Sequence, residues 1–183
     1  MSETAPGIPK PANYLVKVYS GGQVMQTYEA ATFSTSKGEI WIALPGGRHH
    51  ILGSSCSVRL SNSGPEREPT LEALYQADLY SGGRLVESVK VNSFTGYEGN
   101  VYLTDVFADR VVFAGTYVIR RIGSHLNVPR DNSIYRVTVY SDGKSVGTFY
   151  GFQVTTGINM IYLYATNYWD VVLGGNFVAE QYR

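Results

Sequence analysis

The stretch VYSGG at residues 18–22 recurs as LYSGG at 79–83 and as VYSDG at 139–143. Each copy ends a run in which apolar and polar residues alternate, which is the period of a half-buried β-strand. Gly-Gly and Asp-Gly pairs favour tight hairpins, because glycine accepts positive φ angles without steric cost. The three stretches therefore predict three β-hairpins of the same kind.

The hairpins belong to longer segments that share one pattern. Tyr80 follows Tyr19 by 61 residues, and Tyr140 follows Tyr80 by 60 residues. Other positions align at the same spacing: Tyr14, Tyr75 and Tyr135; Phe33, Phe94 and Val154; Gly38, Gly99 and Asn159; Ile42, Leu103 and Leu163. One gap also aligns Gly53, Gly115 and Gly174, and with them Cys56, Val118 and Phe177. We interpret this pattern as three β repeats of about 60 residues.

These repeats give the chain a simple predicted organisation. Two polar stretches that contain proline separate the repeats, SNSGPEREPT at 61–70 and GSHLNVPRDNS at 123–133, and both are typical of linkers or long loops. The predicted units are an extended N-terminal arm at 1–12 and β repeats at 13–61, 71–122 and 133–183, which we call segments 1, 2 and 3.

The alternation assigns side chains to two faces in each segment. The inward positions of the first strands are expected at Val16, Val18, Ala77, Leu79, Val137 and Val139, and the outward ones at Lys17, Asp78 and Thr138. Trp41, Tyr102 and Tyr162 align with one another between apolar residues that point the other way. We expect these rings to face out of their segments, where they either pack between segments or bind a partner. Tyr168 and Trp169, in the stretch NYWD, complete the candidate interaction surface.

Segment 3 resembles the Sm/SH3-like small barrels. The resemblance rests on the Asp-Gly hairpin, the glycine-containing second strand, Asn159 before the third strand, and the closing run VVLGGNFV at 171–178. It implies an all-β fold of packed tandem small barrels. The helix that begins each Sm unit is missing from the pattern, so the RNA-binding residues of that family are not carried over. A single threefold domain, a β-trefoil or a β-prism, also accommodates twelve strands in three repeats.

Composition and charge limit the classes of function. The chain contains 15 basic and 15 acidic residues, and this balance argues against binding that depends on nucleic-acid phosphates. The single cysteine, Cys56, allows no intrachain disulfide. No apolar run is long enough to predict a transmembrane helix. The N-terminal stretch MSETAPGIPKPAN lacks the apolar core of a secretory signal, so we expect a location in the cytoplasm or in a virion.

Residue types that carry chemistry are few and scattered. His49 and His50 are neighbours on a predicted strand, where their side chains point to opposite faces, and His125 lies in a separator. Cys56 is expected to be buried as a small hydrophobic residue. Asp105, Asp109 and Asp170 are expected to be solvated charges. We therefore predict no catalytic, cofactor or metal site, and a protein that is not an enzyme.

Three functions are compatible with this pattern. The first is a structural or interaction protein with protein partners, a component of a larger assembly such as a virion decoration, cement or tail protein. The second is a carbohydrate-binding, lectin-like module with an aromatic platform in each repeat. The third is a small barrel that binds single-stranded nucleic acid by stacking bases on aromatic rings.

Overall fold

The computed structural model describes residues 13–53, 55–61, 67–165 and 169–183. Within these ranges the chain forms 17 strands and no helix, which confirms the predicted all-β class. The described residues thus include no helix that is long and apolar enough to cross a membrane. The predicted arm at 1–12 and half of the first separator lie outside the described residues.

The strands follow one another along each segment. Segment 1 contains β1 (Tyr14–Ser20), β2 (Gln23–Ala30), β3 (Thr32–Ser36), β4 (Glu39–Ala43), β5 (His49–Leu52) and β6 (Cys56–Leu60). Segment 2 contains β7 (Tyr75–Ser81), β8 (Arg84–Tyr97), β9 (Asn100–Asp105), β10 (Arg110–Ala114) and β11 (Thr116–Arg121). Segment 3 contains β12 (Tyr135–Ser141), β13 (Lys144–Gly151), β14 (Gln153–Gly157), β15 (Met160–Tyr164), β16 (Trp169–Gly174) and β17 (Asn176–Gln181).

The three segments pair their strands in the same antiparallel order. The first strand of each segment lies between the second and the last strand, as in β2-β1-β6, β8-β7-β11 and β13-β12-β17. The remaining strands also form a meander, as in β3-β4-β5, β8-β9-β10 and β14-β15-β16. In segment 2 the long strand β8 belongs to both groups, whereas segments 1 and 3 divide it into two strands.

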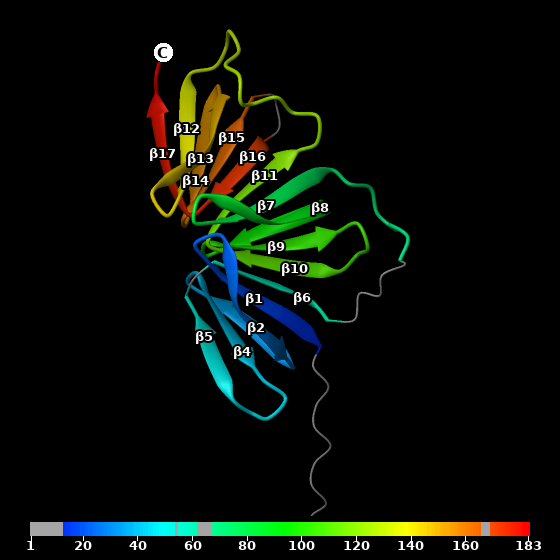
Figure 1. Cartoon of the computed structure of the whole chain (residues 1–183). Coiled ribbons are helices and arrows are strands. Elements are labelled where there is room, and N and C mark those ends of the chain that lie inside the picture. The colour runs from blue at the N-terminus through cyan, green and yellow to red at the C-terminus, as the bar shows by residue number, and fades with distance from the viewer. Residues whose placement is uncertain (1–12, 54, 62–66, 166–168) are drawn as a thin grey trace, which may run out of the picture.

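Strand pairing continues from one segment to the next. The last strand β6 pairs with β10 of segment 2, and β11 pairs with β16 of segment 3. The result is one sheet of 11 strands, β14-β15-β16-β11-β7-β8-β9-β10-β6-β1-β2, with two sheets of three strands beside it. Figure 1 shows these strands spreading like a fan, with segment 1 at the bottom and segment 3 at the top.

This arrangement corrects the predicted tandem barrels. The sheets of the described structure do not close, because β6 and β11 use their second edges for the next segment rather than for their own. The strands are also not divided into three four-stranded sheets, as a β-prism requires. A barrel and an open row bury the same alternating residues, so the sequence pattern alone does not distinguish them.

Cross-strand partners define which residues are equivalent in the three segments. Val18, Leu79 and Val139 lie opposite Cys56, Tyr117 and Phe177. Cys56 therefore corresponds to Tyr117, and the predicted alignment with Val118 was wrong by one residue. Gly115 and Gly175 correspond in the same register, with φ angles of 105° and 91°, so Gly174 is not the counterpart of Gly115.

Each hydrophobic core contains residues from two neighbouring segments. The predicted inward positions are confirmed, since Val16, Ala77 and Val137 are fully buried. The core of segment 1 also includes Val112 and Ala114 of segment 2. The cores of segments 2 and 3 likewise receive side chains across the boundaries, so burial of apolar surface holds the segments together.

Asp78 corrects one of the predicted outward positions. Its side chain faces segment 3 rather than solvent, and the residue is only 3% exposed. The carboxylate accepts hydrogen bonds from Ser88 Oγ at 2.6 Å and from Arg120 Nη2 at 2.9 Å. A buried charge is tolerated when it is paired and hydrogen-bonded in this way, and a sequence pattern does not show that the outer face of one segment is covered by the next.

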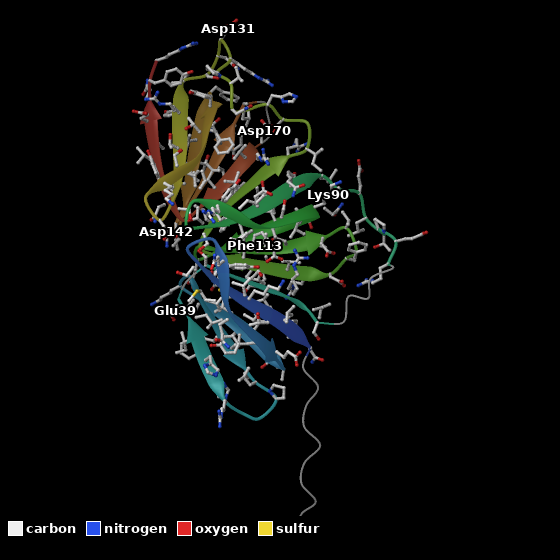
Figure 2. The ribbon with its side chains drawn as sticks, in the orientation of Figure 1. Glu39, Lys90, Phe113, Asp131, Asp142 and Asp170 are labelled. Atoms are coloured by element: carbon white, nitrogen blue, oxygen red, sulfur yellow. The ribbon has the colours of Figure 1, made fainter. Side chains whose placement is uncertain are left out.

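The hairpin turns of the three repeated stretches are stacked on one another. The backbone N–H of Gly82 donates to the Asp142 carboxylate at 2.5 Å, and a Cβ atom on Gly82 would collide with the backbone of Gly21. Figure 2 labels Asp142 at the margin where these turns gather. Gly82 is therefore required by the close approach of the turns as well as by its φ angle.

Gly82→Ala and Gly21→Ala form a matched pair that separates these two requirements. The φ angles are +61° and +58°, but a Cβ on Gly21 meets nothing within 4 Å. We expect Gly21→Ala to lower the free energy of unfolding by about 1 kcal/mol through backbone strain. Gly82→Ala should cost at least about 2 kcal/mol more, because the adjacent turn must move. Urea unfolding measures both values, and equal losses would contradict the stacking of the turns.

Candidate interaction surface

The three predicted aromatic positions lie in equivalent strands. Trp41 is in β4, Tyr102 in β9 and Tyr162 in β15, and they face Ile51, Val112 and Val172 on the neighbouring strands. The residues on either side of Trp41, Ile40 and Ile42, are buried in the core of segment 1. The rings therefore point away from the cores of their own segments, as the sequence predicts.

Tyr102 and Tyr162 fill the same site on the segment before them. Tyr102 packs against the core of segment 1, and its hydroxyl is hydrogen-bonded to Thr35. Tyr162 packs against the core of segment 2. Its hydroxyl lies beside Gly96, where an added Cβ atom would be 3.3 Å from the hydroxyl oxygen. Gly96 is the equivalent of Thr35. Thr35 follows Ser34, which pairs with Trp41, and Gly96 follows Thr95, which pairs with Tyr102.

Trp41 has the same position, but no other segment of the described residues packs against it. Its side chain is exposed, at 45%, and its indole Nε1 donates to Glu39 Oε2 at 3.2 Å. Figure 2 labels Glu39 in the lower part of the molecule, on segment 1. The exposed tryptophan is therefore the uncovered member of a set whose other two members form contacts between segments.

Two edge strands of the described structure, β5 and β17, lie at positions that pair with a neighbouring segment elsewhere in the chain; β2, β3, β13 and β14 are also paired on one side only. Strand β5 pairs only with β4 and strand β17 only with β12 among the described residues. Both strands expose a β-branched apolar side chain, Ile51 at 55% and Val178 at 55%. Free backbone groups beside exposed apolar side chains are the usual features of a surface to which another strand is added.

Two further junction residues were not recognised from the sequence. Tyr19, from β1, is buried in the core of segment 2, and Tyr80, from β7, packs against the core of segment 3. The Tyr19 hydroxyl donates to Glu87 Oε2 at 2.9 Å, and burial raises the pKa of Tyr19 to about 12. The sequence shows that Tyr19, Tyr80 and Tyr140 align. The strand alternation does not show that the Tyr19 and Tyr80 rings enter the core of the next segment.

The acidic residues considered for chemistry have structural partners, and the prediction of solvated charges was wrong for Asp105 and Asp170, which are buried. Asp105 accepts hydrogen bonds from the backbone N–H groups of Phe107 and Asp109, each at 2.9 Å. Asp109 pairs with Arg67 at 2.5 Å. Asp170 is buried and accepts the backbone N–H of Ala165 at 3.1 Å. These carboxylates hold loops and turns in place, which is the role that hydrogen bonds to backbone N–H groups support.

Cys56 and the histidines are separated from these acids. Cys56 is fully buried in the core of segment 1, as predicted, and burial raises the pKa of its thiol to about 12. The half-buried His50 ring lies 5.0 Å from the Tyr28 ring, whereas His49 is exposed. The described ranges contain no group of three or more His, Cys, Asp or Glu side chains arranged to hold a metal ion.

A polar cavity of about 400 Å³ follows the stacked turns. Hydroxyl residues from equivalent positions line it, namely Ser20, Ser81 and Ser141 from the hairpins, with Ser55 and Thr116 from the last turns. Its two titratable side chains, Tyr19 and Asp142, already have partners in Glu87 and the Gly82 N–H. The cavity is thus part of the joint between segments.

Two predicted surface residues are not placed. Tyr168 lies outside the described residues, and for Trp169 the structure describes the backbone of β16 but not the side chain.

No family model, curated protein or solved structure matches this chain. The function is therefore inferred from the contacts and exposed surfaces of the chain itself.

Tyr102→Ala and Trp41→Ala test whether the equivalent rings have different environments. Loss of the packed Tyr102 ring should lower the free energy of unfolding by about 3 kcal/mol, the usual cost of removing a large side chain from a packed site. Loss of the exposed Trp41 ring should change it by less than about 0.5 kcal/mol in dilute protein. Equal effects in denaturant titrations would contradict the assignment of Tyr102 to the joint.

Alkaline pH tests the buried environment of Tyr19. Its pKa is raised in the folded state, so its contribution to stability is complete below pH 10 and is lost as the pH rises to about 12. Over this window the wild type should lose up to about 2 kcal/mol more than Tyr19→Phe. Cys56 is present in both proteins and cancels in the comparison. Parallel curves of unfolding free energy against pH would show that Tyr19 is accessible.

Proposed function

We propose that this protein is a non-enzymatic structural component that joins a larger protein assembly through two of its open sheet edges, those of β5 and β17. The observation that carries this proposal is the exposure of Ile51 on β5 and Val178 on β17. β5 and β17 correspond to the strands that pair at the two internal junctions, but neither pairs with another segment among the described residues. A protein that remains a monomer gains nothing from leaving apolar side chains on unpaired strands.

Neither edge strand, HHIL at 49–52 or NFVAEQ at 176–181, contains lysine or proline; β5 is only four residues long, and β17 carries one charged residue, Glu180. Natural edge strands are protected by lysine, proline, bulges or a covering loop. Both edges therefore favour the addition of another strand, and backbone hydrogen bonds would supply affinity while Ile51 and Val178 supply apolar contact.

On the same basis we propose a more detailed account of the architecture and of its biological setting. The chain is a row of three equivalent modules related to small barrels, each opened so that its last strand joins its neighbour. A virus or phage particle, as a decoration, cement or tail component, is the setting that we infer, with the cytoplasm of the producing cell as the place of synthesis. Such a component needs extended contact surfaces rather than a reaction centre.

Two observations favour this proposal over the ligand-binding alternatives. A lectin-like function needs a similar exposed platform in each segment, but the Tyr102 and Tyr162 rings are used in packing. Stacking of nucleic-acid bases on Trp41 would bring a phosphate backbone near the Glu39 carboxylate, which is bonded to the indole. The one cation beside these rings, among the described residues, is Arg110, 5.8 Å from the Tyr102 ring centre.

The proposal is tested by lysine substitutions at the two edges. We expect wild-type protein to form particles much larger than a monomer, alone or in an extract of its source, when size is measured by light scattering during chromatography. Ile51→Lys or Val178→Lys should reduce the assembled fraction at least tenfold without lowering the unfolding midpoint, because both side chains are exposed. The matched control is Val128→Lys, since Val128 is 59% exposed on a loop.

Two results would contradict the proposal. The first is wild-type protein that elutes as a monomer both alone and in the extract. The second is assembly that both edge variants retain at the wild-type level, because association would then use another surface.

A further inference from the structure

We infer that the partner of both edges is a second copy of this chain, joined head to tail, so that β17 of one copy pairs with β5 of the next. This inference rests on the proposed function and names its partner. It follows from the two junctions that the chain already contains, because the free edges correspond to the strands used there.

The two internal junctions have the same register. At the first, Val58 of β6 lies opposite Val112 of β10, and at the second, Ile119 of β11 lies opposite Val172 of β16. Val58 and Ile119 are equivalent, because they pair on their other side with Val16 and Ala77 at the same first-strand position. Val112 and Val172 are equivalent through Tyr102 and Tyr162.

The same rule gives the register of a junction between two copies. Ala179 pairs with Val137 on β12, and Ile51 pairs with Trp41 on β4, so these residues occupy the positions of Ile119 and Val172. Ala179 would therefore lie opposite Ile51 of the next copy. One residue further along, Glu180 would lie opposite His50, so an acidic and a basic side chain would be cross-strand neighbours.

The positions that would be covered are apolar and currently exposed. Ile51 is 55% exposed, whereas its equivalents Val112 and Val172 are fully buried in the preceding core. Val178 is 55% exposed, whereas its equivalent Val118 is 1% exposed in the core of the next segment. Strand addition at this register would bury both Ile51 and Val178. A partner of unrelated shape would not cover both ends of the row in this way.

The hairpin tyrosines extend the match beyond the edges. Tyr19 and Tyr80 enter the core of the following segment, where Val86 and Val146 pack. These valines are at the bulge that follows each hairpin, and the equivalent residue in segment 1 is Met25, which is 64% exposed. Tyr140 of one copy would reach Met25 of the next in the same way, and a flexible methionine readily packs against an aromatic ring.

Strands β17 and β5 of the same chain cannot pair with each other. Figure 1 shows β17 and β5 on the outermost parts of segments 3 and 1, with segment 2 between them. The contact is therefore heterologous, and successive copies extend into a filament or close into a ring, depending on the rotation between copies. The internal junctions are held by covalent connections, whereas this one depends on protein concentration.

Disulfide trapping between separate variants tests the inference. Ala179→Cys and Ile51→Cys are prepared as two single variants of the full chain, mixed across a wide concentration range and oxidised. Opposite residues of antiparallel strands are separated by about 4.5–5.5 Å between Cα atoms, which a disulfide spans. The native Cys56 is fully buried, so wild-type protein is the background control, and a mixture of Ala179→Cys with His49→Cys is the off-register control.

We expect crosslinked dimer in the Ala179→Cys and Ile51→Cys mixture at a yield at least tenfold above that of either variant alone or of the off-register mixture. Crosslinking of either variant with itself would show a twofold contact and overturn the inference. Monomer mass in all purified samples, without crosslinks, would also overturn it. In that case, edge-dependent assembly in the source extract would still support the proposed function, so the two failures are distinguishable.

Discussion

The structure depends on one constraint, the antiparallel pairing of the last strand of a segment with the next-to-last strand of the following segment. The pairs Val58–Val112 and Ile119–Val172 mark the same point of this pairing at the two junctions. Because side chains alternate along a strand, each junction strand contributes one face to its own core and the other to its neighbour's. The shared cores, the buried tyrosines and the stacked turns all follow from this pairing.

The same constraint explains why the surface is not uniform. A closed barrel removes its own edges, but in this row the strands equivalent to those of the internal junctions, β5 and β17, have no partner segment among the described residues. Segment 1 therefore exposes Trp41 and Ile51, and segment 3 exposes Val178, at positions that are covered elsewhere. These exposed side chains are explained by the geometry of the row, and the head-to-tail contact that we infer would cover them.

Much of the local structure could be predicted from the sequence, because hairpins and alternation are local signals. The β class, the three hairpins, the inward valines and the outward direction of Trp41 required only strand periodicity and turn chemistry. The partner of β6 could not be predicted, because pairing with either β5 or β10 buries Cys56 and Val58 on the same face. The burial of Asp78 and the roles of Tyr19 and Tyr80 depend on that non-local choice. The predicted alignment of the last strand of segment 2 was also shifted by one residue. It matched Gly115 with Gly174, whereas the structure matches Gly115 with the adjacent Gly175, and the sequence alone allows either choice.

Hydrogen exchange of the backbone amides measures the junction pairing most directly. In dilute monomer, the amides of β6, β10, β11 and β16 should exchange as slowly as those of β1 and β7, because the junction ladders open only with the cores that they share. The outward-facing amides of β5 and β17 should exchange much faster under the same conditions. Junction amides that exchange as fast as those of the two free edges would contradict the account, because the segments would then open independently of one another.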